Sequence, residues 1–280
     1  MTEILTAVEV TEFAGPLLAR LREQRPLVQT ITNFVSMDVA ANALLAIGAS
    51  PAMVHAPEEV ADFLRLSTAL VINIGTLSKH WVESMLIAAA AAQAERKPWV
   101  LDPVGVGATA FRNDTVAALL AHGPAIVRGN ASEIMAIARI AGVTDAVAVP
   151  KGVDAANTTA EAEGLAVALA QRLSCVIAAT GAEDIVTDGT RLVRLANGDP
   201  LMSRVTALGC ALSAIAGAFA GVTDDAFEAT AAAVAIYGVA GEMAAEGDQR
   251  IGTGSYRVGF LDELDRIEAA DVAARLKVVM

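Results

Sequence analysis

The sequence predicts an α/β fold, with a mostly parallel central sheet covered by helices on both faces. Short runs rich in β-branched residues alternate with Ala-rich stretches of helical length, the pattern of repeated strand–helix units. Aromatic residues make up only 4% of the chain, so small aliphatic side chains must form the core and allow close helix-on-sheet packing. The 280 residues are 55% hydrophobic and 19% charged, which excludes a disordered chain.

Strands and helices alternate over the first two thirds of the chain. The strands are expected at residues 27–31, 69–74, 99–102, 125–128, 175–179, 184–187 and 191–195. The helices between them are expected near residues 38–47, 79–94, 115–121, 131–140 and 159–173. From residue 209 onward the chain is expected to form three further helices, near 209–221, 225–246 and 256–276.

The segments 184–187 and 191–195 carry the clearest hairpin signal, because Asp188-Gly189-Thr190 joins them. We therefore expect them to form an antiparallel edge on an otherwise parallel sheet. No Pro- or Ser-rich linker, charge block or repeat divides the chain. Residues 1–280 are accordingly expected to form a single domain.

The uncharged stretch from Val205 to Val222 is long enough to raise the question of a membrane span. Thr, Ser and Gly residues dilute its hydrophobicity, and Asp224 and Asp225 follow at once. We expect a buried core helix here and no membrane insertion.

The charge balance limits the partners of the chain. A net charge of −12 opposes binding along the phosphate backbone of a nucleic acid. It leaves room for a phosphate ligand, which a few backbone N–H groups and one Arg can hold locally. The two cysteines have neither disulfide nor metal-ligand spacing, and the first residues contain no basic signal region, so a reducing cytoplasm is expected.

The residues that follow each expected strand are the candidate site, since ligands of open α/β sheets bind beyond the carboxyl ends of the strands. These residues are Thr32-Asn33, Gly75-Thr76, Asp102 to Gly107, Arg128-Gly129-Asn130, Thr180-Gly181 and Ala207 to Cys210. Carboxylates, one Arg and many Gly residues suit a metal-bound phosphate chain. The alternative is that Gly, Asn and Thr stand there for turn geometry alone.

The segment from Arg128 to Glu133 leaves an expected strand and enters an expected helix. Asn130 can cap that helix, and Glu133 then lies at its third position. Two interpretations stay open. Glu133 either reaches back to the backbone as part of the cap or lies near the water shell of Mg²⁺, with Arg128 against a phosphate oxygen.

Gly209 and Cys210 open the uncharged helix. A helix N-terminus offers unpaired N–H groups and positive potential, which suit a transferring phosphoryl group and lower the pKa of a thiol in the first turn. Cys210 is therefore either a polar group beside the reacting hydroxyl or a small core residue. Cys175, inside an expected strand, is assigned to the core.

Several short motifs occur together along the chain. They are Thr30-Ile31-Thr32-Asn33 with Ala41-Asn42, Gly48 to Met53, Asp102-Pro103-Val104-Gly105, Arg128 to Ile134, Thr180-Gly181 with Val186 to Gly189, and Gly209-Cys210. On these residues the sequence, from about Leu27 to Leu264, resembles the hydroxyethylthiazole kinases of the ribokinase-like superfamily.

The resemblance implies a ribokinase-like three-layer α/β/α fold. It implies ATP-dependent phosphorylation of the hydroxyl of 4-methyl-5-(2-hydroxyethyl)thiazole, for thiamine salvage. The site residues it implies are Met53, Gly209 and Asn33 for the thiazole, Arg128 and Thr180 for ATP, Asp102 and Glu133 for Mg²⁺, and Cys210, at the position of the Asp base of related sugar kinases. Members of the family form homotrimers with sites at subunit boundaries, and the resemblance implies the same for this chain. Asn33 and Met53 are therefore expected to serve a neighbour's site.

Three positions depart from the family pattern. The family commonly has Val-Thr-Gly-Thr-Gly-Cys where this chain has Ala207 and Leu208 before Gly209-Cys210, and Asp38 stands where Asn is common. If the first Gly position needs φ > 0, Ala207 strains it by about 1–2 kcal/mol. Leu208 also removes a hydroxyl that could bond phosphate. The alternatives are a kinase for another small alcohol and a binding protein with lost turnover.

Overall fold

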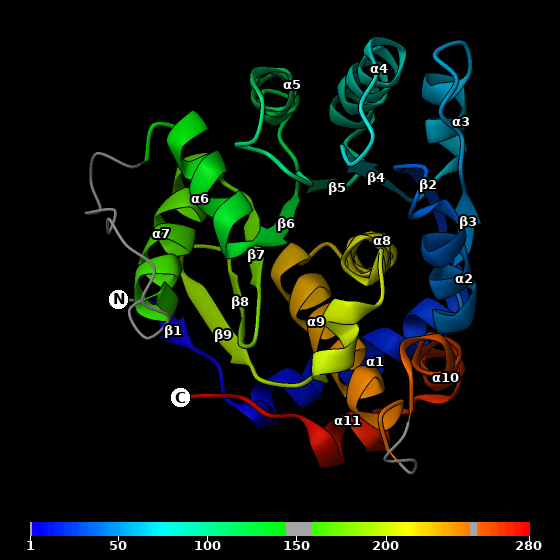
Figure 1. Cartoon of the computed structure of the whole chain (residues 1–280), viewed down its shortest axis with the longest axis vertical. Coiled ribbons are helices and arrows are strands. Elements are labelled where there is room, and N and C mark those ends of the chain that lie inside the picture. The colour runs from blue at the N-terminus through cyan, green and yellow to red at the C-terminus, as the bar shows by residue number, and fades with distance from the viewer. Residues whose placement is uncertain (1, 144–157, 247–250) are drawn as a thin grey trace.

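The computed structural model describes residues 2–143, 158–246 and 251–280. Its described strands form one nine-stranded sheet in the order β1-β9-β8-β7-β6-β5-β4-β2-β3 (Figure 1). The strands are β1 (Glu3–Ile4), β2 (Leu27–Ile31), β3 (Ser50–Ala52), β4 (Ala69–Asn73), β5 (Trp99–Asp102), β6 (Ile126–Asn130), β7 (Val176–Thr180), β8 (Asp184–Thr187) and β9 (Arg191–Leu195). Neighbouring strands are parallel except at β8, which pairs antiparallel with both β7 and β9.

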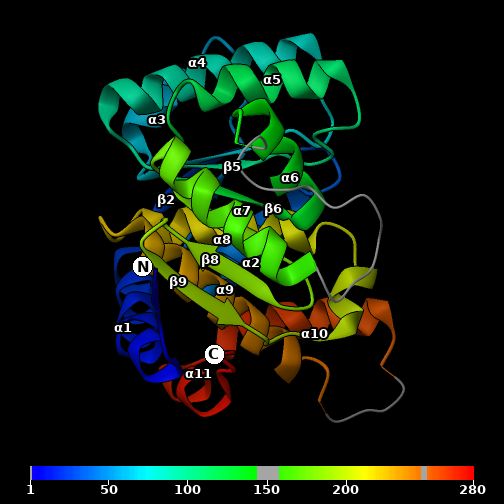
Figure 2. The ribbon, with the colours of Figure 1, turned by 90° about the vertical axis from the view of Figure 1, so that its left-hand side faces the viewer.

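Helices cover both faces of the sheet, as the sequence predicts. One face is covered by α3 (Val60–Leu66), α4 (Lys79–Glu95), α5 (Ala110–Leu120), α6 (Ala131–Ile140) and α7 (Thr158–Leu173). The other is covered by α1 (Ala7–Gln24), α2 (Met37–Ile47), α8 (Leu208–Ala220), α9 (Ala226–Met243), α10 (Thr253–Arg266) and α11 (Ala269–Arg275). Figure 2 shows α4 and α5 on one side of the sheet and α9 and α10 on the other, so the fold has three α/β/α layers.

The strand sequences explain the two cores. Successive side chains of a strand point to opposite faces. In β4, Val71 packs into the core under α8, whereas Leu70 and Ile72 pack into the core under α4. Small residues let α8 lie close to the sheet, because a Cβ added at Gly217 would be 2.4 Å from Val71 Cγ2.

The uncharged stretch forms the buried helix α8, and its length and apolar character fit the core. Within the described part of the chain, no helix meets the length and hydropathy needed to cross a membrane.

Two predictions about elements are wrong. The expected helix at 256–276 is two helices, because the chain is extended at Ile267 and a capping box of Glu268 and Asp271 starts α11. The β8–β9 hairpin does not form the edge of the sheet, since β1 pairs in parallel outside β9.

Several described elements were not anticipated, namely α1, α3, β1, β3 and the 3₁₀ helix η2 (Pro200–Arg204). Helix α1 contains Gly15 and Pro16, residues that weaken a helical signal in sequence. Its start is nevertheless well specified, because Thr6 and Glu9 form a capping box.

Both ends of the described chain contact β9. Strand β1 pairs with it on one side, and Glu3 N donates to Thr190 O. Near the C-terminus, Val279 N donates to Arg194 O and Lys277 N donates to Asn197 Oδ1. The segment that follows β9 is therefore held by residues about 80 positions later.

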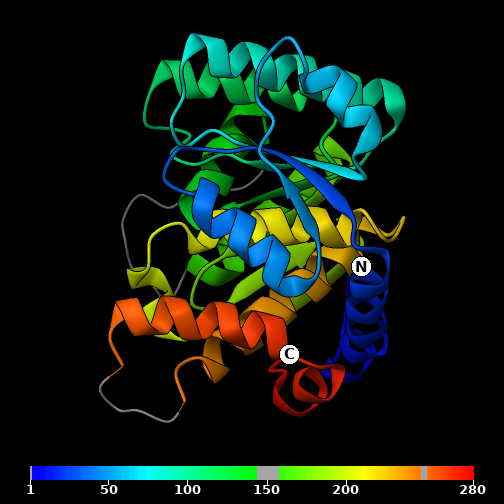
Figure 3. The ribbon, with the colours of Figure 1, turned by 90° about the vertical axis from the view of Figure 1, so that its right-hand side faces the viewer.

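The departure at Asp38 has a structural explanation. Asp38 lies in the first turn of α2, where a carboxylate is favourable. It accepts from Asn42 Nδ2 and forms an ion pair with Arg257 of α10. Figure 3 shows α2 and α10 side by side on the face opposite α4.

Candidate functional site

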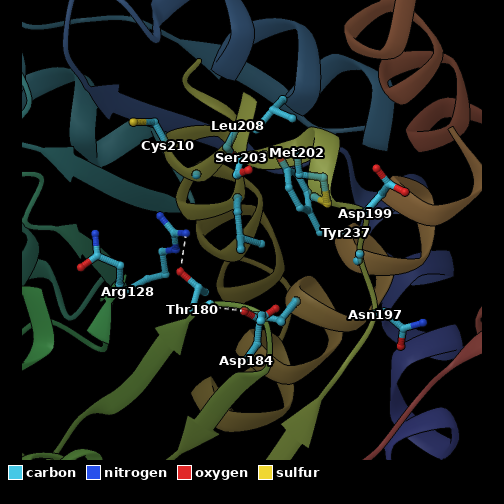
Figure 4. Close-up of a pocket in the computed structure, with 18 of the residues that line it drawn as sticks. Arg128, Thr180, Asp184, Asn197, Asp199, Met202, Ser203, Leu208, Cys210 and Tyr237 are labelled. Atoms are coloured by element: carbon cyan, nitrogen blue, oxygen red, sulfur yellow. Dashed lines mark hydrogen bonds between the residues drawn. The ribbon is translucent and has the colours of Figure 1, made fainter. Parts of the chain in front are cut away.

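A cavity of about 730 Å³ lies at the carboxyl ends of β5, β6, β7 and β9 (Figure 4). Parallel strands bring their carboxyl ends to one edge of the sheet, which is why residues distant in sequence meet there. Its wall includes the start of α8 and the segment Ala196–Ser203, which contains part of the 3₁₀ helix η2 (Pro200–Arg204). Of the predicted site residues, those lining it are Asp102, Arg128, Glu133, Thr180, Gly209 and Cys210.

Asp102 ends β5 and is completely buried. Its Oδ2 accepts hydrogen bonds from Asn73 Nδ2 at 2.7 Å and Ser213 Oγ at 2.8 Å. Its Oδ1 has no hydrogen-bond partner among the residues that the structure describes. Burial raises the pKa of Asp102 to about 6, with the positive charge of Arg128 acting in the opposite direction. The carboxylate thus keeps one unpaired oxygen in a cavity wall.

Glu133 takes part in the cap that the sequence allows. Asn130 Oδ1 accepts from Glu133 N at 3.0 Å, and Glu133 Oε2 accepts from Asn130 N at 2.8 Å. Glu133 Oε1 also accepts from Gly105 N at 2.9 Å. The capping interpretation is therefore confirmed. Because Glu133 also lines the cavity, the cap does not exclude a role near a ligand.

Arg128 belongs to β6, and its side chain lies between Thr180 at the end of β7 and Gly209 at the start of α8. Its Nη2 donates to Thr180 Oγ1 at 2.6 Å, and within the described part of the chain its buried Nε has no hydrogen-bond partner. A Cβ added at Gly209 would lie 2.8 Å from Arg128 Nη1, so the missing side chain lets the guanidinium approach the helix. An Arg with an unpaired buried N–H at a helix N-terminus is well suited to an anion.

The start of α8 contains a strained residue. Ala207 has φ 68° and ψ 3°, and no side chain caps the helix. The sequence-based concern about Ala207 is therefore confirmed: this position does need φ > 0. Leu208 points into the core, and its carbonyl accepts from Tyr237 Oη at 2.6 Å.

The expectation of a lowered thiol pKa at Cys210 is wrong. Burial raises that pKa first, and the negative charge of Asp102 raises it further. Hydrogen bonds with Asn33 and Asn73 and the charge of Arg128 lower the pKa by less, so its net direction is upward. Cys175 is buried in the core as predicted, and burial raises its pKa to about 12.

Asn33 and Met53 are outside the described residues that line the cavity. Asn33 contacts a residue that does line the cavity, because its Nδ2 lies 3.5 Å from Cys210 Sγ. The same Nδ2 donates to Asn73 Oδ1 at 2.8 Å. Met53 follows β3 at the outer edge of the sheet. Their predicted thiazole contacts stay predictions.

Sequence reasoning missed three polar residues around the cavity. Asn73 was counted only as part of an apolar strand, and Ser213 only as part of the uncharged helix. Asp184 begins β8, and the antiparallel direction of that strand brings its start, rather than its end, to the cavity. Its Oδ1 accepts from Gly181 N at 2.9 Å, and burial raises its pKa to about 6. For Asn73 and Asp184, the available signal was a polar residue at one end of an apolar strand; Ser213, inside its helix, gave no such signal.

The donor set fits a magnesium ion that is shared with a phosphate ligand. Across the described ranges, no group of three or more His, Cys, Asp and Glu side chains could hold a metal alone. Mg²⁺ is commonly bound by one or two carboxylates together with water and substrate phosphates. The unpaired Oδ1 of Asp102 and the carboxylate of Glu133 in one cavity match that pattern.

Comparison with solved structures identifies the fold. The structure of a hydroxyethylthiazole kinase protein from Pyrococcus horikoshii superposes with a TM-score of 0.87 at 41% identity, covering 96% of this chain and 98% of that one. A ribokinase-like superfamily protein from Enterococcus faecalis gives a TM-score of 0.60 at 12% identity, covering 95% and 96%. The ribokinase-like fold predicted from the sequence is confirmed.

Sequence comparison identifies the family. The model of the hydroxyethylthiazole kinase family matches residues 18–270. A hydroxyethylthiazole kinase from Cereibacter sphaeroides is 54% identical over 94% of this chain and 98% of its own length. One from Rhizobium leguminosarum is 51% identical over 94% and 96%. The family model and the identity to these relatives both extend over most of the chain. The chain therefore belongs to the hydroxyethylthiazole kinase family.

Proposed function

We propose that this protein transfers the γ-phosphoryl group of ATP to the hydroxyl of 4-methyl-5-(2-hydroxyethyl)thiazole, a step of thiamine salvage. The observation that carries the proposal is the cavity that joins Arg128, the unpaired Oδ1 of Asp102 and the uncapped start of α8. Phosphoryl transfer depends mainly on positioning and charge stabilisation, and this wall supplies both. Family membership supplies the substrate class.

At the phosphate end, Arg128 and Thr180 bind ATP. The guanidinium, held by its hydrogen bond to Thr180 Oγ1, offers its remaining N–H groups to phosphate oxygens. Asp102 and Glu133 are the residues that would hold Mg²⁺ together with the phosphates of ATP. When bound, Mg²⁺ neutralises charge on the phosphate oxygens.

At the acceptor end, Gly209 and Asn33 contact the thiazole alcohol. Backbone N–H groups at the uncapped start of α8 stabilise charge on the transferring group. Cys210 lies beside the reacting hydroxyl. Burial raises the pKa of its thiol, which disfavours the thiolate, so we assign Cys210 to orienting that hydroxyl.

We further propose that the chain acts as a single-domain subunit of a homotrimer, with Met53 completing a neighbour's site. Met53 lies beyond β3, the outermost strand on its side of the sheet. In the β2–α2 connection nearby, Phe34 and Val35 are exposed apolar side chains. Burial of such surface favours association. Both cysteines are free, which supports a cytoplasmic location.

ADP release with Mg·ATP, with and without the thiazole alcohol, tests the activity. We expect release to require both the alcohol and Mg²⁺. Asp102→Asn should lower kcat at least 100-fold, whereas Asp114→Asn, at an exposed position on α5, should leave it within twofold. No ADP release at saturating substrate would refute the kinase. Light scattering of the purified protein tests the trimer.

The strained Ala207 favours one second candidate, a binding protein of this fold that has lost turnover. It would be stabilised thermally by ATP or the thiazole without releasing ADP. A double variant, Ala207→Gly with Leu208→Thr, separates the two. Activity only in that variant would favour the binding protein.

A further inference from the structure

The side chains behind Asp102 have fixed hydrogen-bond directions. Gly75 N donates to Asn73 Oδ1 at 2.9 Å, so the Nδ2 of Asn73 must face Asp102. Val35 N and Ser36 N donate to Asn33 Oδ1, so the Nδ2 of Asn33 must face Asn73. Backbone amides thus set the orientation of both side-chain amides.

Ser213 departs from the behaviour of comparable hydroxyls in this molecule. Buried Ser and Thr residues in helices commonly donate to the carbonyl four residues earlier. Ser84 and Thr230 do so, bonding His80 O and Ala226 O. Ser213, equally buried, instead donates to Asp102 Oδ2 at 2.8 Å.

Asn73 and Ser213 reach the same carboxylate oxygen from different elements. Asn73 ends β4, next to β5, and Ser213 lies in α8, one turn after Cys210. Two donors on Oδ2 fix the plane of the carboxylate and leave Oδ1 unpaired. Partners of this kind orient metal ligands and carry about 10–100-fold of metal affinity or activity.

We propose that Asn73 and Ser213 are positioning residues of the phosphoryl-transfer site, which fix Asp102 so that Oδ1 alone is offered to the cation bound with the nucleotide. The proposal rests on the proposed function of Asp102. Ser213 also ties the helix that carries Gly209 and Cys210 to β5, so the acceptor end and the cation end keep their relative position.

Metal-dependent nucleotide binding tests the proposal without relying on turnover. The variants are Ser213→Ala, Asn73→Ala and, as the matched control, Ser84→Ala, which removes a hydroxyl of equal burial from α4. Calorimetry measures the Kd of ADP with and without Mn²⁺, and assays measure kcat and the KM of the thiazole alcohol. Urea denaturation checks folding.

In Ser213→Ala and Asn73→Ala we expect the Kd of ADP with Mn²⁺ to rise about 10-fold, while the Kd without metal stays within twofold. The kcat should fall about 10–100-fold with little change in the KM of the alcohol. Ser84→Ala should change none of these values. If Asn73→Ala fails to fold, Ser213→Ala decides alone, since it removes a single oxygen atom.

The proposal is overturned if Ser213→Ala leaves the Kd of ADP with Mn²⁺ unchanged, or if Ser84→Ala shows the same loss. It is also overturned if the wild type binds ADP equally with and without metal. A wild type that binds ADP with Mn²⁺ but does not phosphorylate the thiazole alcohol refutes the proposed function instead, and the binding measurements still decide the role of Ser213.

Discussion

The α-helices α6 and α8 both begin at the cavity, and their starts differ. At α6, Asn130 and Glu133 form a reciprocal capping box that satisfies amides of the first turn. At α8, the preceding residue is Ala207 in a left-handed conformation, and neither a side-chain cap nor an acidic residue occupies the first turn. The start of α6 is closed by its own side chains, whereas the start of α8 is open.

The two helix starts differ in whether their N–H groups stabilise the free protein or stay available to a ligand. A helix start without partners for its N–H groups costs stability unless another group satisfies them. Capping the start of α8 would stabilise the free protein but would occupy the amides that a phosphoryl group can use. The start of α6 is therefore complete without a ligand, whereas the start of α8 keeps the N–H groups that the proposed phosphoryl transfer needs.

Among changes at the two helix starts, the largest effect is expected from Gly209→Ala at the open start. The new Cβ would lie 2.8 Å from Arg128 Nη1 and displace the guanidinium. We expect kcat/KM for ATP to fall about 100-fold with little loss of stability. Ala131→Ser, which adds one atom at the exposed first position of α6, should change activity less than twofold. Full activity in folded Gly209→Ala would mean that Arg128 need not contact α8.

At the closed start, Asn130→Ala should act mainly on stability. It removes the acceptor for Glu133 N but keeps the backbone N–H that Glu133 Oε2 accepts. We expect the free energy of unfolding in urea to fall by about 1–2 kcal/mol. Asn130→Ser should recover most of this loss. An unchanged free energy of unfolding would show that the capping box contributes nothing.

A smaller gain in stability is expected from Ala207→Gly. Glycine adopts a φ of 68° without the cost that alanine pays, although it loses more entropy on folding. We expect a net gain of about 0.5–1 kcal/mol in the free energy of unfolding. Ala214→Gly, inside the same helix, should have the opposite sign. A fall in the free energy of unfolding in both variants would show that Ala207 is not strained.

The smallest effect is expected in the reactivity of Cys210. Since its pKa is raised, less thiolate is present at neutral pH, and the pH midpoint of iodoacetamide alkylation should lie above that of free cysteine. A Cys175→Ser background leaves one thiol to follow by mass spectrometry. A midpoint below that of free cysteine would mean that the helix N-terminus outweighs burial.

The two starts also show what the sequence could predict. Asn130 with Glu133 is a local signal, since the cap and its partner lie three residues apart. Asp102, Arg128 and Thr180 lie in the carboxyl-terminal halves of strands that the apolar runs mark clearly, and parallel pairing brings them to one edge. The fold class and the core of the candidate site were therefore predictable.

The remaining features depend on contacts between distant segments. Ser213 bonds to Asp102, 111 residues earlier, and nothing in its own helix indicates that contact. Asp184 required the direction of β8 in the sheet. The pKa of Cys210 required its burial, which opposes the helix-end effect that is visible locally.

The contacts of β9 with the C-terminal segment have a consequence for synthesis. Asn197, which lines the cavity, accepts from Lys277 N and donates to Arg275 O. During translation the sheet edge and the phosphate-end residues emerge long before these partners. The cavity rim can reach its final arrangement only after residues 275–279 leave the ribosome, so a nascent chain is expected to bind nucleotide weakly until then.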